Sequence, residues 1–309
     1  MSKIIIVGHK NPDTDSVVSS IAAQEYFEKV LGKESKAYCA GMLNNETKFI
    51  LEKLEVEIPK LFEKIEDDEC AAIVDHNQPS QIVDGLDYGK IEYIFDHHNL
   101  NIVTEKPIFV RVEPIGSTSS LIAKMFFEKG ITPSEVTSKL LLSGILSDML
   151  NFTSPTTTDE DRKLADKLNE IAKLDMQEFV TEMFKAKSSL EGISIEDVIT
   201  LDYKTFEMGS KNVGIGTWET TLPESVNIKK DEIFAALEKK KALENLDYMF
   251  FMVVDILQGN CQLYIIGDAE KELAEKVFGK EAENKLMTLP GVVSRKKQIV
   301  PQLTEELSK

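Results

Sequence analysis

The stretch GHKNPDTDS, residues 8–16, follows a short run rich in β-branched residues and stands directly before a helical pattern at residues 17–30. It places His9, Asp13 and Asp15 in a loop that leads from a strand into a helix. In parallel sheets, ligands bind in the loops beyond the carboxyl ends of the strands. Aspartate and serine are also common in turns and at helix N-caps, so this loop alone leaves a purely structural interpretation open.

Strand and helix patterns alternate outward from this loop. Short apolar runs predict strands, and amphipathic stretches that open on polar capping residues predict helices. The expected strands lie at residues 3–8, 71–74, 93–95 and 109–112. The expected helices lie at residues 17–30, 116–129, 133–151 and 159–172. This alternation predicts an α/β fold with a doubly wound, mostly parallel sheet that has helices on both faces.

The character of the sequence changes near residues 185–194. Paired β-rich runs around turn residues and one charged amphipathic helix follow, at 205–208 with 212–218, 248–256 with 261–266, and 229–245. We therefore expect a second, smaller α+β domain with a mixed sheet. The predicted boundaries are residues 1–187 for the first domain, 188–194 for a hinge linker and 195–309 for the second domain.

Histidine is confined to the start of the chain, where all 4 histidines lie close to aspartates. Asp75 and the Asp-His-His run at 96–98 come at the ends of two further expected strands, and Asp148 lies on an expected helix. Because the carboxyl ends of parallel strands meet at one edge, we expect these side chains to gather near residues 8–16. Carboxylates suit Mg²⁺ and Mn²⁺, and imidazoles shift the preference toward transition metals. The excess of carboxylates predicts a two-metal site of the kind that supports phosphoryl transfer.

The adjacent histidines carry a geometric expectation. On extended backbone, consecutive side chains point to opposite faces, so we assign His97 to a metal and His98 to the substrate. We expect Asp96 to orient a histidine rather than to bind a metal itself. We expect His76 to face away from Asp75, as a structural histidine whose hydrogen bonds are satisfied.

A basic run stands out near the end of the sequence. Residues 294–298 read SRKKQ between two apolar pairs, and they offer Arg295 and Lys296 for contact with phosphate. An isolated run of this kind is also typical of a solvated turn. Lys204 is a weaker candidate for the same role.

The overall composition excludes some classes of function. The chain has 36 Lys and Arg against 53 Asp and Glu, and its net charge of −17 disfavours nucleic acid as a partner. The longest apolar run, residues 248–254, is far shorter than the roughly 20 residues of a membrane span, and no secretory leader is recognisable. The 3 cysteines are widely spaced, which suits reduced thiols. We therefore expect a cytoplasmic protein that has no membrane partner.

Taken together, these motifs resemble the DHH phosphoesterase superfamily. The resemblance is carried by residues 8–16, the Asp-His-Asn motif at 75–77 and the Asp-His-His motif at 96–98. The SRKKQ run at 294–298 narrows it to the manganese-dependent, family II inorganic pyrophosphatases, and the likeness covers essentially the whole chain. One departure is Gln78, where members often carry Glu.

The resemblance implies hydrolysis of pyrophosphate to two phosphates in a cleft between two domains, by a hydroxide that two metal ions activate. It implies a first metal site formed by His9, Asp13 and Asp75. It implies a second metal site, with Asp75 bridging, formed by Asp15, Asp75, His97 and Asp148. It implies that the substrate phosphates are bound by His98, Lys204, Arg295 and Lys296.

The cofactors that follow from the resemblance are two Mn²⁺ per subunit, for which Co²⁺ or Mg²⁺ can substitute, and additional Mg²⁺ that arrives with the substrate. The expected small-molecule partner is pyrophosphate. We also expect the chain to form a homodimer.

Other functions stay open at this stage. A short-chain exopolyphosphatase of the same superfamily shares the C-terminal domain type. Oligonucleotide phosphodiesterases typically end in a domain with a glycine-rich histidine motif, and no histidine follows His98 here. A non-enzymatic metal-binding protein could use the same fold, although every expected type of metal ligand is present. Comparing hydrolysis of pyrophosphate with that of tripolyphosphate distinguishes a pyrophosphatase from a short-chain exopolyphosphatase. Phosphate release with Mn²⁺ distinguishes an enzyme from a non-enzymatic metal-binding protein.

Overall fold

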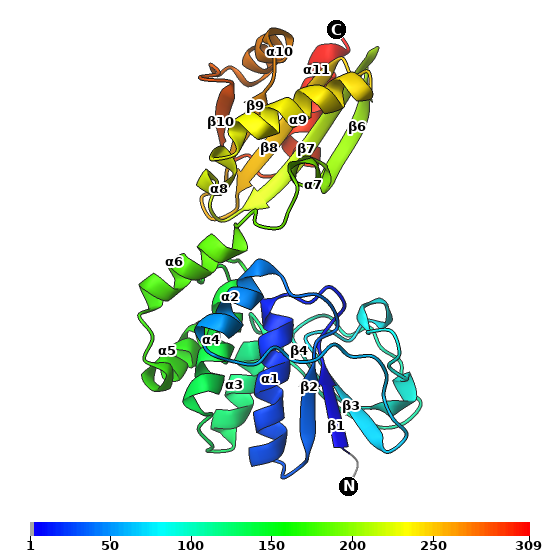
Figure 1. Ribbon diagram of the computed structural model, residues 1–309, viewed down its shortest axis with the longest axis vertical. Coiled ribbons are helices and arrows are strands. Elements are labelled where there is room, and N and C mark those ends of the chain that lie inside the picture. Colours follow the sequence, from blue (N-terminus) through cyan, green and yellow to red (C-terminus); the bar gives the residue numbers. More distant parts are fainter. Residues whose placement is uncertain (1–2) are drawn as a thin grey trace. The chain divides into compact units, whose positions relative to one another are not determined.

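The first compact unit of the chain is built on a parallel sheet. The computed structural model describes residues 3–309 and divides after Ala186 into two compact units (Figure 1). The strand order of the first unit is β2-β1-β3-β4-β5, and these strands pair in parallel. The strands are β1 (Lys3–Val7), β2 (Ser35–Tyr38), β3 (Glu69–Val74), β4 (Ile91–Asp96) and β5 (Phe109–Val112). The parallel α/β sheet expected from the sequence is confirmed.

Long helices cover one face of this sheet. Helices α1 and α3 pack on the strands, and α4 packs against both of them (Figure 1). Several of these helices begin after a polar residue whose side chain accepts a backbone N–H of the first turn, as in Asp13, Ser117, Ser134 and Thr158. The helices of the unit are α1 (Thr14–Lys29), α2 (Asn45–Lys53), α3 (Thr118–Glu128), α4 (Glu135–Asp148), α5 (Asp159–Ala172) and α6 (Met176–Lys187).

The opposite face of the sheet is covered by the irregular chain that joins β3 to β4. Ile5 and Ile73 of the sheet pack there in one apolar cluster with Ile82 of the connecting segment. That segment contains the single-turn helices η1 (Pro79–Gln81) and η2 (Tyr88–Lys90). The helices expected on both faces are therefore long on one face and reduced to single turns on the other.

The strand order creates a switch point between β1 and β3. From β1 the chain passes through α1 to β2 on one side, whereas β3, β4 and β5 lie on the other side. Ligands of open α/β sheets bind at such a point, beyond the carboxyl ends of the strands. The loops that leave β1 and β3 carry His9 and Asp75, so the topology places these two side chains at the expected edge.

The second unit contains a mixed sheet of order β10-β9-β8-β7-β6. Strands β7 and β8 pair in parallel, and the neighbouring pairs are antiparallel. The strands are β6 (Asp202–Met208), β7 (Lys211–Thr220), β8 (Tyr248–Asp255), β9 (Asn260–Ile265) and β10 (Leu286–Pro290). The helices are α7 (Ile195–Thr200), α8 (Glu224–Asn227), α9 (Lys230–Leu243), α10 (Asp268–Phe278), the π-helical turn η3 (Arg295–Ile299) and α11 (Val300–Leu307). The mixed sheet expected from the sequence is confirmed.

Alternate residues of the second sheet supply two apolar clusters. Ile215 and Phe250 belong to one cluster, whereas Phe251 and Tyr264 belong to the other. Because neighbouring residues of a strand point to opposite faces, each cluster covers one face of the sheet. None of the helices between residues 3 and 309 has the length and apolar character needed to cross a membrane.

Candidate metal centre

The loops after β1 and β3 bring three candidate metal ligands together. The Nε2 atom of His9 lies 3.5 Å from Oδ2 of Asp13 and 3.5 Å from Oδ2 of Asp75. Asp75 is buried, with 2% of its surface exposed. One ligand atom from each of these residues lies within 4.8 Å of the others, so a single metal ion could contact all three.

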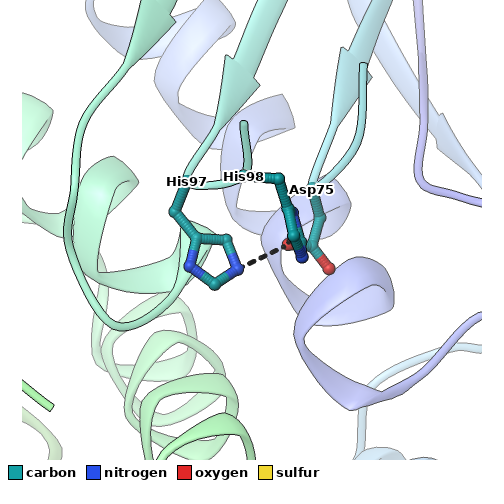
Figure 2. Close-up of side chains that lie close together, drawn as sticks. All are labelled: Asp75, His97 and His98. Atoms are coloured by element: carbon teal, nitrogen blue, oxygen red, sulfur yellow. Dashed lines mark ion pairs between the residues drawn. The ribbon is translucent and has the colours of Figure 1, made fainter. Parts of the chain in front are cut away.

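A second group shares Asp75 with the first. The Nε2 atom of His97 lies 3.4 Å from Oδ1 of Asp75, and Figure 2 shows the His97 ring directed at that carboxylate. The same nitrogen lies 3.5 Å from Oδ2 of Asp148 at the end of α4. Ligand atoms of Asp15, His97 and Asp148 lie within 4.8 Å of one another. Asp75 therefore directs one oxygen toward each imidazole, so that its carboxylate lies between His9 and His97.

The second nitrogen of each imidazole orients the ring. Nδ1 of His9 donates to the carbonyl of Lys10 at 2.8 Å, and Nδ1 of His97 donates to the carbonyl of Ile115 at 3.0 Å. In a neutral ring this leaves the Nε2 lone pair facing the carboxylates. Nε2 of His97 is buried and makes no hydrogen bond with any residue from 3 to 309. A buried nitrogen without a hydrogen bond fits the role of a metal ligand.

The clustered carboxylates favour positive charge at their centre. Burial raises the pKa of Asp75, but the imidazoles of His9 and His97 outweigh it and hold that pKa below its usual value. Burial and the Asp75 charge raise the pKa of Asp15 to about 7, and burial raises that of Asp148 well above its usual value. Burial alone would lower the pKa of His9, yet its carboxylate neighbours raise it to about 11. A divalent cation would supply the positive charge that this cluster favours.

The N-terminus of α3 holds the buried carboxylates in place. The backbone N–H groups of Thr118 and Ser119 donate to the two oxygens of Asp15 at 2.8 and 3.0 Å. The Thr118 hydroxyl donates to Oδ1 of Asp75 at 2.9 Å. The partial positive charge at a helix N-terminus stabilises a carboxylate placed there. The sequence-based interpretation missed this role of Thr118, although the run at 116–119 marks the start of an expected helix.

Two backbone features allow this close packing. A Cβ atom on Gly144 of α4 would lie 2.6 Å from Oδ1 of Asp15 and 2.2 Å from the Ser119 hydroxyl oxygen, so a glycine is needed where α4 passes the centre. The backbone of Asp75 has a φ of 63°, in the left-handed region that residues other than glycine rarely adopt. Backbone strain of this kind is concentrated at functional sites.

The expectation that His97 and His98 point to opposite faces is wrong. Strand β4 ends at Asp96, so the backbone is no longer extended at these residues, and their ring centroids are 4.3 Å apart (Figure 2). Both rings belong to a third group with Asp75 that could hold a metal ion. Their contacts differ, because Nδ1 of His98 donates to Oδ1 of Asp96 at 2.8 Å and 47% of the His98 side chain is exposed. The expectation that Asp96 orients a histidine is confirmed.

His76 is buried beside the centre, but only one of its nitrogens is satisfied. Nδ1 donates to the carbonyl of Val74 at 2.8 Å, whereas the buried Nε2 has no hydrogen-bond partner within residues 3–309. Burial lowers the pKa of His76 to about 4, which keeps the ring neutral. The expectation of a fully satisfied structural histidine is therefore wrong for Nε2.

A cavity of about 250 Å³ opens onto the centre. Its small size and polar side chains suit a small charged ligand better than a large apolar one. It is lined by His9, Asp13, Asp75, His76, Gln78, Ser80, Gln81, His98 and Asp148. His98 thus shares one cavity with several candidate metal ligands. The sequence-based interpretation missed Ser80 and Gln81, which carry no motif signal of their own.

The basic candidates lie in the second unit. Lys204 on β6 and Lys296 in η3 are exposed. The Arg295 guanidinium donates to the backbone carbonyls of Asp202 and Ile215 at 2.6 and 3.0 Å, and to the Asp202 carboxylate at 2.6 Å. Arg295 is therefore anchored within its own unit. It begins a π-helical turn, a conformation often found at functional sites.

Known families match both units. Residues 3–145 match the model of the DHH family, N-terminal domain, and residues 181–306 match that of the DHHA2 domain. A probable manganese-dependent inorganic pyrophosphatase from Exiguobacterium sp. is 40% identical over 311 residues, which cover 100% of both chains. The manganese-dependent inorganic pyrophosphatase of Methanocaldococcus jannaschii is 38% identical, over 96% of this chain and 97% of that protein. The chain belongs to the manganese-dependent inorganic pyrophosphatases.

Solved structures agree with membership of this pyrophosphatase family. A putative family II inorganic pyrophosphatase from Methanococcus jannaschii matches with a TM-score of 0.63 and 37% identity, over 99% of this chain and 100% of that chain. An exopolyphosphatase-related protein from Bacteroides fragilis matches with a TM-score of 0.53 and 15% identity, over 99% of this chain and 93% of that one. At such low identity the second likeness shows the fold alone. The family expected from the motifs is confirmed.

Proposed function

We propose that this chain hydrolyses inorganic pyrophosphate to two phosphates and depends on manganese. The observation that carries the proposal is the position of Asp75, whose two oxygens face His9 at 3.5 Å and His97 at 3.4 Å. Such a shared carboxylate suits a two-metal site. Relatives that are 38% and 40% identical over nearly the whole chain are named for this activity.

The proposed metal ligands fall into two sets that share Asp75. The first set is His9, Asp13 and Asp75, and the second is Asp15, Asp75, His97 and Asp148. Carboxylate oxygens mixed with imidazoles suit Mn²⁺, and Co²⁺ or Mg²⁺ can substitute. Two such ions, when bound, lower the pKa of a water molecule and neutralise charge on phosphoryl oxygens. Nε2 of His97 makes no hydrogen bond with any residue that the structure describes and lies within 3.5 Å of the carboxylates of Asp75 and Asp148, which supports its place in the second set.

His98 is proposed to bind a phosphate oxygen of the substrate. Its Nδ1 is held by Asp96, which leaves Nε2 as the ring atom available for a ligand in the cavity that His98 lines. Contact with Asp96 raises the pKa of His98, which favours the protonated ring. A protonated Nε2 can donate to a negatively charged oxygen and stabilise charge that develops during hydrolysis.

Three cations of the second unit are proposed to bind the same substrate, which carries additional Mg²⁺. They are Lys204, Arg295 and Lys296. The exposure of Lys204 and Lys296 supports this role, because both ammonium groups can reach a ligand. A chain with a net charge of −17 needs local positive charge to hold so anionic a substrate.

We propose residues 1–187 as the metal-binding domain, 188–194 as a hinge linker and 195–309 as the substrate-binding domain. The Ser188 and Thr221 hydroxyls are hydrogen-bonded at 2.7 Å, and Leu190 and Ile193 pack on the core of the second unit. These contacts tie most of the linker to the second unit. Bending is therefore expected at the start of the linker, directly after α6.

Two further proposals concern the state of the protein. A cytoplasmic location is supported by the free, buried thiols of Cys39, Cys70 and Cys261, which suit a reducing compartment.

A homodimer is supported by β5, which forms an edge of the first sheet and exposes 52% of Phe109 and 41% of Val110. Exposed apolar edge strands tend to pair with another chain. Light scattering of the purified chain in solution measures the oligomeric state.

Phosphate release from pyrophosphate, compared with Mn²⁺, Mg²⁺ or Co²⁺ present, tests the proposed function. We expect the fastest release with Mn²⁺. Tripolyphosphate in place of pyrophosphate tests the alternative of a short-chain exopolyphosphatase. Faster release from tripolyphosphate would favour that alternative, and no release from either would favour a metal-binding protein without enzymatic activity.

A further inference from the structure

A buried carboxylate that belongs to neither ligand set contacts residues next to the candidate metal ligands. Glu46, the second residue of α2, is only 2% exposed. Its Oε2 atom accepts a hydrogen bond from the Thr14 hydroxyl at 3.0 Å and another from the Ser147 hydroxyl at 2.7 Å. These hydroxyls come from parts of the chain more than one hundred residues apart, so a single oxygen atom joins α1 to α4.

Both hydroxyls belong to immediate neighbours of candidate ligands. Thr14 stands between Asp13 and Asp15, and Ser147 directly precedes Asp148. The Thr14 hydroxyl also lies 3.0 Å from that of Thr47. Because the single Thr14 hydrogen is donated to Glu46, the Thr47 hydroxyl donates to Thr14. Two residues of the first turn of α2, Glu46 and Thr47, are thus hydrogen-bonded to the Thr14 hydroxyl at the start of α1.

Asp148 is placed where its own helix does not stabilise it. It is the last residue of α4, and a helix C-terminus carries partial negative charge that opposes a carboxylate. The carboxylates of Asp15 and Asp75 add further repulsion. The chain then turns through left-handed residues, with φ of 46° at Leu150 and 52° at Asn151. Through Glu46, the Ser147 hydroxyl at this end of α4 is linked to Thr14 at the start of α1.

We propose that Glu46 is a positioning residue of the metal centre. By holding Thr14 and Ser147 on one oxygen, it fixes the distance between Asp15 and Asp148 in the second ligand set and steadies Asp13 in the first. The proposal rests on the ligand sets assigned above. Loss of groups that orient metal ligands typically lowers metal affinity by about 10- to 100-fold.

Mn²⁺ affinity of the full chain, measured by equilibrium dialysis, tests this proposal. Glu46→Leu removes the acceptor at similar volume, and we expect Mn²⁺ to bind about tenfold more weakly or worse. Glu46→Gln keeps an amide oxygen that can accept both hydroxyls, and we expect a smaller loss. Ser147→Ala breaks only the link to the Asp148 end, and we expect it to weaken Mn²⁺ binding as well.

Glu25 provides a matched control at the other end of the same helix pair. It lies on α1 and accepts from the Ser134 backbone N–H at 2.8 Å, the Ser134 hydroxyl at 2.6 Å and the Thr137 hydroxyl at the start of α4. Glu25→Leu therefore removes a similar tie between α1 and α4 away from the ligands. We expect it to lower the melting temperature without changing Mn²⁺ affinity.

Several outcomes would overturn the proposal. If Glu46→Leu lowers the melting temperature as Glu25→Leu does and leaves Mn²⁺ affinity unchanged, Glu46 merely supports the fold. If Glu46→Leu does not fold, unchanged Mn²⁺ affinity in Ser147→Ala decides against the proposal, and weaker binding supports it. If the unaltered chain binds no Mn²⁺, the ligand sets themselves fail, and the role of Glu46 fails with them.

Discussion

Asp75 combines three unusual properties for an aspartate. It is buried, it has a left-handed φ of 63°, and it directs its two oxygens at different imidazoles. A further hydrogen bond from the Thr118 hydroxyl fixes the carboxylate at 2.9 Å. A buried charge with strained backbone costs stability, and such costs are typical of functional sites, which agrees with the proposed place of Asp75 in both ligand sets.

Asp75→Ala is expected to remove stable binding of both metal ions, because each ligand set loses a member. Manganese per chain, measured by elemental analysis after gel filtration, should fall far below that of the unaltered protein. Asp84→Ala is the control, since Asp84 is 96% exposed and pairs with Lys10. Retention of two manganese ions per chain by Asp75→Ala would show that the carboxylate does not bridge.

His98→Gln is expected to leave manganese content nearly unchanged and to slow hydrolysis about tenfold or more, since a charged hydrogen bond to phosphate is lost. His97→Gln serves as the comparison, and it should lose metal because Nε2 of His97 faces Asp75 and Asp148. The two histidines also form one group with Asp75 that could hold an ion. Loss of metal in His98→Gln alone would therefore reverse the two assignments.

At the scale of elements, the centre depends on how α4 crosses the start of α3. Gly144 brings α4 close to Asp15, and the N-terminus of α3 donates two backbone hydrogen bonds to the same carboxylate. The carboxylate of Asp15, a proposed metal ligand, is thus close to the main chain of both helices. A Cβ atom at position 144 would force α4 or the side chains of Asp15 and Ser119 to shift.

Gly144→Ala is expected to destabilise the fold by about 1–3 kcal/mol, as overpacking of a close contact usually does. It should also weaken Mn²⁺ binding, because the added Cβ would lie 2.6 Å from Oδ1 of Asp15. Denaturant unfolding and Mn²⁺ titration measure the two effects. Ser143→Ala is the control on the same helix, since it adds no atoms. An unchanged Mn²⁺ affinity in Gly144→Ala would mean that α4 can shift without disturbing Asp15.

The elements of the fold that could be predicted are those with a distinctive local pattern in the sequence. The runs that became β1 and β5 were visible as short apolar runs, and α5 was visible as an amphipathic stretch. Strand β2 has four residues with alternating burial, and α2 is short and charged, so neither pattern stands out. Their place is decided by packing against α1 and β1, which a local pattern does not contain.

In the candidate site, too, some features could be predicted from the sequence and others depend on tertiary contacts. Its Asp and His side chains could be predicted because strand order brings strand ends to one edge. The mutual position of His97 and His98 could not, because it depends on β4 ending at Asp96. Glu46 was also missed, since its role arises from contacts with Thr14 and Ser147, far away in the sequence.

At the scale of the whole molecule, the residues proposed to bind metal and the cations proposed to bind substrate lie in different units. The proposed metal ligands lie in the first unit, and the proposed substrate cations Lys204, Arg295 and Lys296 lie in the second. We propose that one pyrophosphate engages both sets, with the chain bending directly after α6. Closure of this kind excludes water and strengthens the electrostatic contacts to the phosphates.

Lys296→Ala tests this division of labour in the intact chain. Loss of a charged contact to phosphate is expected to lower kcat/KM by about 10- to 100-fold, with manganese content unchanged. Because the contact is made fully only when both sets hold the substrate, kcat should fall together with the affinity for pyrophosphate. Lys297→Ala is the matched control, since Lys297 is the next residue of η3 and is also exposed. Equal losses in the two variants would indicate a general effect of surface charge, whereas full activity of Lys296→Ala would remove Lys296 from the substrate site.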